Sequence, residues 1–219
     1  MRIFLATVFC LAAASASAQT SFGVKAGGNM SFLNHKIEEG NQNVKWNGSR
    51  VGFQVGGVAQ IGIAENFALQ PELLFMMKGV NKMDVEELGD AKLNIKTFTI
   101  DMPITFVYRT KGFFGGIGPN LSFGLSSKMK VDGNDDVEYD LYDKSDDQGE
   151  VMLFSQKRFE AGANILAGYK LKNGLTFSLN YVQGLTNNSR YNDDLDGEDA
   201  SIKIRSSYIG LSVGYFFGK

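Results

Sequence analysis

The sequence predicts an all-β fold, an eight-stranded antiparallel up-and-down barrel that crosses a lipid bilayer. Apolar residues occupy every second position in eight stretches of the chain, which is the period of a β-strand. The connections between these stretches alternate between short and long. The polar face of the stretches is rich in glycine, which contributes 26 of the 219 residues, against 3 prolines. Short turns at one rim and long polar loops at the other are typical of transmembrane β-barrels.

The first segment of the chain reads as a secretory signal peptide. A positive start at Arg2, an apolar run over residues 3–14 and an Ala-Ser-Ala ending predict cleavage before Gln19. We therefore expect a leader at 1–18 and a barrel domain at 19–219. An N-terminal membrane anchor is the alternative, but the apolar run is shorter than the roughly 20 residues that a spanning helix needs. The single cysteine, Cys10, lies in the leader, so export without disulfides indicates a bacterial envelope protein.

The eight expected strands follow in order along the remaining chain. In the seventh, Leu175, Phe177 and Leu179 face one side while Thr176 and Ser178 face the other. The strands are expected at 22–32, 50–63, 67–78, 94–109, 113–126, 159–171, 175–181 and 208–217. Tight turns are expected at 64–66, 110–112 and 172–174, and long loops at 33–49, 79–93, 127–155 and 186–201. The two kinds of connection therefore lie at opposite ends.

Alternation alone does not say which face of the strands lies inside. In a soluble lipocalin-like barrel the apolar face would point inward around a ligand, and in a membrane barrel it would face lipid. Two observations favour the membrane barrel. The polar face combines glycine with large charged side chains, which suits a narrow, filled lumen. The apolar face carries aromatic residues near both strand ends, at 22, 67, 108, 113, 169 and 215 and at 32, 75, 98, 123 and 159, as lipid–water interfaces select.

Several short motifs resemble the PorT-like outer-membrane β-barrel family of Bacteroidota. They are Gly-Val-Lys-Ala-Gly-Gly-Asn at 23–29, Leu-Gln-Pro-Glu-Leu-Leu-Phe at 69–75, Asp-Met-Pro-Ile at 101–104, Gly-Ile-Gly-Pro-Asn at 116–120, the Gly-Ala-Asn and Gly-Tyr pairs at 162–164 and 168–169, and Asn-Tyr-Val-Gln-Gly-Leu-Thr-Asn at 180–187. The resemblance covers the mature chain. It implies an eight-stranded barrel in the outer membrane, and the founding member is tied to type IX secretion.

Charged and polar side chains on the inward face form the candidate site. They are Lys25, Gln54, Glu72, Asp101, Arg109, Glu160 and Lys170. Charges in a low-dielectric interior must be paired, so we expect a salt-bridge and hydrogen-bond plug that fixes the barrel shape. A gate or narrow ion path is the alternative, but eight strands leave no open channel.

The long loops offer two weaker candidates. Carboxylates cluster at 132–150 and 193–199, and an Asp-rich turn with Asp194 and Asp196 matches the first half of an EF-hand loop, although Lys203 stands where a bidentate Glu is needed. A solvated acidic face is the plainer interpretation. A rim hydrolase would use the single histidine, His35, near Ser31 and Glu38, but no catalytic motif accompanies it.

The sequence therefore predicts a monomeric, non-enzymatic barrel without a metal or cofactor. Outer-membrane lipid and an envelope or secretion-system protein are the expected partners, and both termini would be periplasmic. A formal net charge of −2 gives no indication of a nucleic-acid partner. A barrel that binds or transports a small solute, a soluble lipocalin-like barrel and a rim hydrolase remain the alternatives.

Overall fold

The computed structural model describes residues 20–39, 42–84, 92–132, 138–142, 156–189 and 200–217. The expected leader at 1–18 lies outside these ranges. Within them, no helix is long and apolar enough to span a membrane.

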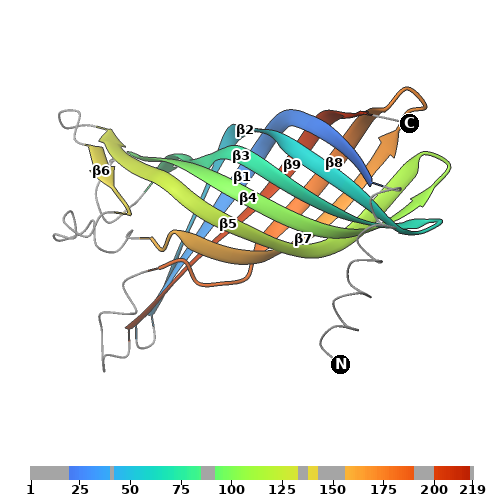
Figure 1. The fold of residues 1–219 in the computed structure, drawn as a ribbon. Coiled ribbons are helices and arrows are strands. Elements are labelled where there is room, and N and C mark those ends of the chain that lie inside the picture. The colour runs from blue at the N-terminus through green and yellow to red at the C-terminus, as the bar shows by residue number, and fades with distance from the viewer. Residues whose placement is uncertain are drawn as a thin grey trace, which may run out of the picture.

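Eight long antiparallel strands close into a barrel, as the sequence predicts (Figure 1). Each pairs with its neighbours in the chain, β1 pairs with β9, and the β4–β5 pairing completes the ring. The long strands are β1 Thr20–Glu39, β2 Gln42–Ala64, β3 Phe67–Asp84, β4 Lys92–Thr110, β5 Phe113–Asp132, β7 Phe159–Lys170, β8 Leu175–Gly184 and β9 Ala200–Phe217. A short additional strand, β6 Glu138–Asp140, pairs with β5 at one end of the barrel.

Three tight turns define the short-turn end of the barrel. The β4–β5 turn places Lys111 and Gly112 at φ 47° and 90°, the left-handed pair of a two-residue hairpin. Gly174, at φ 92°, ends the β7–β8 turn in the same region of φ. Glycine adopts this conformation without steric cost, so it fixes where these strands reverse. The β1 and β9 ends lie at this same end, since Phe22 pairs with Phe217.

The apolar face of the strands points outward. Large hydrophobic side chains such as Leu211 and Ile117, each 67% exposed, cover the barrel wall. The polar side chains of the same strands are buried inside, among them Gln54 at 1% and Asp101 at 0%. An apolar exterior around a polar interior is the arrangement of a membrane barrel and the reverse of a soluble one. The lipocalin-like alternative is therefore wrong about which face is inside.

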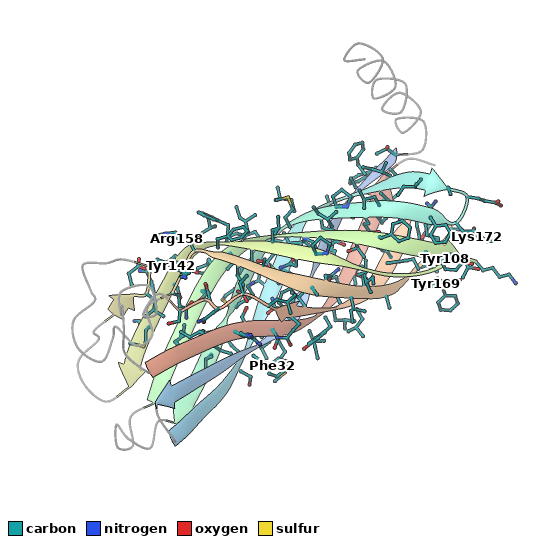
Figure 2. The ribbon with its side chains drawn as sticks, turned by 90° about the horizontal axis from the view of Figure 1, so that it is seen from below. Phe32, Tyr108, Tyr142, Arg158, Tyr169 and Lys172 are labelled. Atoms are coloured by element: carbon teal, nitrogen blue, oxygen red, sulfur yellow. The ribbon has the colours of Figure 1, made fainter. Side chains whose placement is uncertain are left out.

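Aromatic side chains gather on the outer wall toward both ends. Tyr108 and Tyr169 lie near the short-turn end (Figure 2). There the rings of Phe67 and Tyr108 have centroids 5.2 Å apart, and those of Phe113 and Tyr169 4.7 Å apart. Toward the other end, which we call the long-loop end, Phe75 contacts both Phe53 and Phe98. These rings flank the apolar band, as aromatic girdles do at bilayer interfaces.

The strands run further at the long-loop end than the sequence predicts. Residues 33–49 were expected as a loop, yet β1 and β2 stay paired as far as Glu39 and Gln42. Likewise β3 and β4 pair to Asp84 and Lys92, and β6 lies within the expected 127–155 loop. The apolar alternation marks the part of each strand with an apolar outer face. Beyond the apolar part, backbone hydrogen bonds continue the pairing of the strands, and these bonds leave no alternation of apolar residues in the sequence.

Inward-facing glycines let neighbouring strands approach closely. A Cβ added at Gly56 would collide with the backbone carbonyl of Leu73, and one at Gly118 with the carbonyl of Ile104. Outward-facing Gly57, by contrast, would meet nothing closer than 4.0 Å. The inward-facing glycines therefore leave space for charged side chains in the lumen, and they also allow the close approach of strands that the tightly curved wall requires.

Candidate functional site

A chain of hydrogen bonds runs through the lumen toward the short-turn end. The Lys25 ammonium donates to Glu72 Oε2 at 2.7 Å, and both side chains are almost fully buried. Gln70 donates to the other carboxylate oxygen at 2.9 Å, and Gln60 donates to Gln70 at 3.0 Å. Arg109 Nη1 donates to Gln60 Oε1 at 3.2 Å. Five side chains thus link the middle of the barrel to its short-turn mouth.

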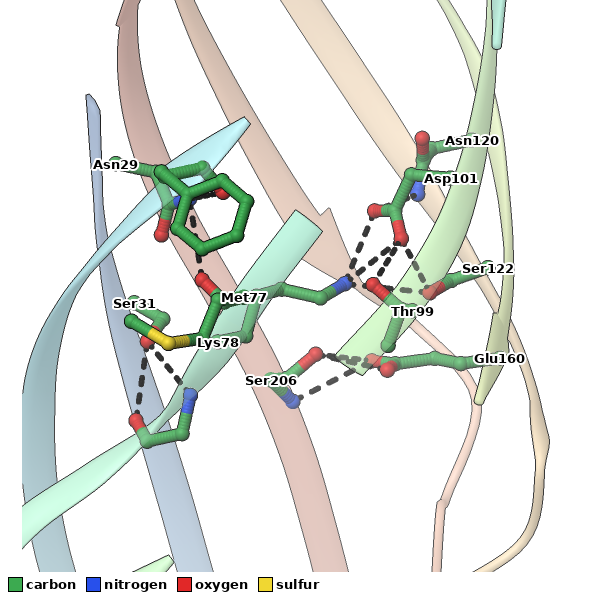
Figure 3. Close-up of polar contacts among 12 residues, drawn as sticks. Asn29, Ser31, Met77, Lys78, Thr99, Asp101, Asn120, Ser122, Glu160 and Ser206 are labelled. Carbon is green, nitrogen blue, oxygen red and sulfur yellow. Dashed lines mark hydrogen bonds and ion pairs between the residues drawn. The ribbon is translucent and has the colours of Figure 1, made fainter. Parts of the chain in front are cut away.

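A second polar cluster surrounds Asp101, which is fully buried (Figure 3). Lys78 Nζ donates to both carboxylate oxygens at 2.9 and 3.1 Å. Thr99 and Ser122 donate hydroxyl hydrogen bonds of 2.7 Å each, and Asn120 approaches at 3.4 Å. The Asp101 carboxylate accepts from four side chains, so its charge is compensated in the low-dielectric interior.

Lys78 is the partner of Asp101 that the candidate set lacks. It alternates in phase with Glu72 at the end of the third apolar stretch, and its Nζ also lies 5.2 Å from the centroid of the Tyr208 ring. The sequence signal that identifies Lys78 is its position in β3, because every second residue of a strand lies on the same face. The even-numbered residues Gln70, Glu72, Leu74, Met76 and Lys78 are all buried.

Gln54 and Glu160 are bound by neutral partners. Gln54 Nε2 donates to Ser212 at 2.6 Å and to Asn180 at 3.3 Å across the lumen. Both Glu160 carboxylate oxygens accept from the Ser206 hydroxyl, at 2.7 and 2.8 Å. These contacts tie β2 to β8 and β9, and β7 to β9, across the inside of the wall.

Apolar side chains share the lumen with these networks, which the sequence analysis did not predict. Leu74, Met76, Val182 and Tyr208 form one buried cluster. Val107, Phe114 and Leu166 form a second one. Leu166, in β7, is almost fully buried and packs in this second cluster. The lumen is therefore a mixed core, with apolar layers between the polar ones.

A turn after β6 covers the long-loop end of the lumen. Leu141 and Tyr142 are 1% and 5% exposed, and the Leu141 amide donates to the Ser127 carbonyl at 2.8 Å. The Arg158 guanidinium lies 4.8 Å from the centre of the Tyr142 ring. Burial is the main cause that raises the pKa of the Tyr142 phenol above its usual value, and the nearby Glu160 carboxylate adds to it. The neutral phenol therefore remains inside the barrel end.

Beneath this turn lies a cavity that holds about 40 Å³ of water-accessible space. Its lining includes Lys78, Thr99, Ser122, Tyr142 and Glu160. A single water needs roughly 10–15 Å³ measured in this way, so the cavity accommodates only a few waters.

Arg109 and Lys170 depart from the predicted pattern of paired charges. Arg109 contacts a neutral glutamine, and Lys170 Nζ lies 4.4 Å from the centroid of the Phe216 ring. Neither has a carboxylate partner in the part of the chain that the structure describes. Both are half-buried where the lumen opens at the short-turn end. Arg109 therefore joins the predicted plug through a hydrogen bond to Gln60 rather than through an ion pair, whereas Lys170 contacts the Phe216 ring.

The remaining candidates lie partly or wholly outside the described residues. Asp194 and Asp196, the calcium candidates, fall in the gap between 189 and 200. The backbone of His35 lies in β1, opposite Trp46 and Ile204, rather than in a loop. Among the described side chains, no group of three or more His, Cys, Asp or Glu residues is placed to hold a metal ion.

A closed antiparallel barrel with an apolar wall, aromatic girdles and a polar interior defines a protein of the outer-membrane β-barrel class. The model of the family described as "Outer membrane protein beta-barrel domain" matches residues 14–190. The chain belongs to this family and is a small β-barrel of the bacterial outer membrane. Among curated proteins, no sequence match is found.

Solved structures of similar shape include other outer-membrane barrels. Neisserial surface protein A is 14% identical, with a TM-score of 0.46, over 90% of this chain and 97% of its own. OprG from Pseudomonas aeruginosa is 13% identical, with a TM-score of 0.46, over 91% and 97%. A major outer membrane protein from Thermus thermophilus is 12% identical, with a TM-score of 0.43, over 90% and 99%. At these identities the likeness concerns the fold alone.

Proposed function

We propose that this protein is a structural and interaction barrel of the envelope, whose filled lumen holds the long-loop end in a fixed shape for a protein partner. The observation that carries the proposal is the lumen itself. Inside the barrel, Lys25 with Glu72 links β1 to β3, Lys78 with Asp101 links β3 to β4, and Tyr142 covers one end. Such a core resists deformation, because breaking any one of these contacts leaves a buried polar group unpaired.

The orientation that fits this role puts the short turns and both termini in the periplasm. Outer-membrane barrels of bacteria have short periplasmic turns and longer extracellular loops. In this chain both β1 and β9 have their terminal ends at the short-turn end. The long-loop end, with its paired hairpins and acidic connections, would then face outward and meet the partner.

The finer assignment to the PorT-like family is part of this proposal. It rests on the order of the glycine-rich and Asn-Tyr motifs along the strands. It points to a secretion-system component as one class of envelope partner. We further propose that the protein is monomeric, acts without catalysis, metal or cofactor, and contacts outer-membrane lipid through its apolar wall.

Photo-crosslinking in the native host tests the interaction role. A crosslinking amino acid at Arg205, exposed at the long-loop end, should give a discrete adduct with an envelope protein. The matched control carries the probe at Thr110, exposed beside a short turn, and should not give that adduct. Absence of an adduct from Arg205 and from a second exposed position there, Lys96, in a correctly folded barrel would refute the proposed interaction.

A barrel that takes up a small solute is the second candidate. One observation favours it, an open pocket of about 510 Å³ at the short-turn end. Continuous passage would require a path past Phe114 and Leu166, which pack together below this pocket. Single-channel recording separates the candidates, since transport through the lumen requires a measurable current and the filled barrel does not conduct.

A further inference from the structure

The pocket at the short-turn end has a composition unlike the rest of the lumen. We call it the basic vestibule, and it is a space of about 510 Å³ between the turns. Four cationic side chains line it, together with one carboxylate and a partly apolar floor. The residues that matter here are Arg109, Lys111, Lys170, Lys172, Phe114 and Phe216.

The vestibule carries an excess of positive charge. Its four cations face a single lining carboxylate, that of Glu65. Elsewhere in the lumen the arrangement differs, since the buried lysines Lys25 and Lys78 each pair with a carboxylate. No described carboxylate pairs with any of the four vestibule cations. Charges of one sign in a concave site with low-dielectric walls focus the field and attract ions of the opposite sign.

Arg109 is held in place with donors left over. Its Nη1 is anchored on Gln60, which is fixed in turn through Gln70 to Glu72. Its Nε is buried and has no hydrogen-bond partner among the described residues. A buried N–H group without an acceptor is unfavourable, so an acceptor that enters the vestibule would be favoured. The planar guanidinium matches the geometry of two oxygens on one anionic group.

Part of the floor of the vestibule is apolar. Phe114 packs with Val107 and Leu166 deeper in the lumen, and the chain from Gln60 to Glu72 supplies the polar part. Phe216 lies beneath Lys170, whose Nζ is 4.4 Å from the ring centroid. The vestibule thus lies at the mouth of the barrel and opens toward the short-turn side.

We propose that the basic vestibule binds a phosphate-bearing anion, with Arg109 and Lys170 on the phosphate oxygens and Lys111 and Lys172 at the entrance. A doubly charged group suits an excess of three positive charges better than a single carboxylate does. The volume exceeds that of one phosphate, so an organic remainder fits beside it. The source is a free phosphate compound or a phospholipid headgroup, because the entrance adjoins the aromatic girdle at Phe113 and Tyr169.

Isothermal titration tests the site on residues 19–219, the expected barrel domain, refolded in maltoside micelles, whose headgroups carry no phosphate. The probe is inorganic pyrophosphate, and we expect saturable binding with a submillimolar Kd at low ionic strength. Arg109→Gln with Lys170→Gln should weaken binding at least tenfold. The matched control, Lys96→Gln with Arg205→Gln, removes the same charges at the far end and should change Kd less than twofold.

Two results would overturn the proposal. One is the absence of saturable heat with the unmodified protein, and the other is an equal loss of affinity in the control variant. If the Arg109 and Lys170 variant fails to fold, Lys111→Gln with Lys172→Gln replaces it. These two lysines are exposed on turns, and their loss should weaken binding at least threefold.

Native mass spectrometry then identifies the source of the phosphate. The protein is released from maltoside micelles that contain phosphatidic acid, with and without pyrophosphate. Retained lipid that pyrophosphate displaces assigns the vestibule to a headgroup. Pyrophosphate binding with no lipid displaced assigns it to free phosphate compounds. A protein that binds neither probe contradicts the proposal.

Discussion

Replacement of Asp101 by Asn removes the charge at the centre of the best-connected cluster in the lumen while keeping the size of the side chain. The Lys78 ammonium, 6% exposed, would keep the one remaining amide oxygen, the Ser122 hydroxyl at 3.2 Å and the face of Tyr208, but it would lose the negative charge that it pairs with. The new amide would also place an N–H₂ donor among groups that donate to Asp101. The expected result is a substantial loss of folding free energy.

The magnitude follows from the contacts. Breaking a buried ion pair by removing one partner costs about 3–5 kcal/mol. The Glu160 carboxylate interacts electrostatically with Lys78 and offsets part of the loss, so we expect about 3 kcal/mol. Lys78→Gln combined with Asp101→Asn replaces the ion pair by two amides. The double variant should regain at least about half of that loss, because the two sites are directly coupled.

Urea titration of the barrel refolded into vesicles measures these free energies, followed by circular dichroism and by gel mobility without boiling. Glu65→Gln makes a similar carboxylate-to-amide change on an exposed turn and should stay within about 0.5 kcal/mol of the unmodified protein. The reasoning is refuted if Asp101→Asn is as stable as this control. It is also refuted if the double variant is no more stable than the single one.

Three further predictions concern the wall and the covered end. Gly56→Ala should cost about 1–3 kcal/mol because the added Cβ meets the neighbouring strand, whereas Gly57→Ala should be nearly neutral, and equal effects would contradict the packing argument. Leu211→Arg on the lipid face should cost about 2–4 kcal/mol in vesicles, whereas Ile63→Arg beside a turn should cost about 1 kcal/mol or less. Equal costs at the two positions would indicate that the wall faces water. The raised pKa of Tyr142 means that the folded state disfavours the ionised phenol, so the free energy of unfolding falls as pH rises above about 10. Tyr142→Phe should lessen that fall, measured by urea titration at a series of alkaline pH values.

The strand pattern of the wall was predictable because, within the apolar band, the hydrophobicity of each residue indicates whether its side chain faces outward or inward. Leu211 and Ile117 alternate with small or polar neighbours, and the closed barrel follows from eight such stretches. The extent of the strands was not predictable in the same way. Between Leu33 and Glu39 the pairing of β1 with β2 depends on backbone hydrogen bonds, which leave no hydrophobic signature.

The lumen was predictable in composition but not in pairing. The phase of each strand places Lys25, Glu72 and Asp101 inside. Which groups meet depends on the stagger between strands, and that stagger brings Lys78 rather than a candidate residue to Asp101. The same stagger leaves Arg109 at the mouth of the barrel, where it donates to Gln60 and pairs with no carboxylate of the described strands and turns. Side chains that meet across the barrel are separated by up to 158 positions in the sequence, as Gln54 and Ser212 are.

Single-channel recording of the purified barrel in a planar bilayer is the most direct test of the central claim, that the lumen is a packed core. The paired charges, the apolar clusters and the covered end predict a stable baseline without discrete openings across the voltage range that bilayers tolerate. The fold of the protein used for recording is verified by its gel mobility without boiling. Regular openings of uniform size from correctly folded protein would contradict the account and favour transport through the lumen.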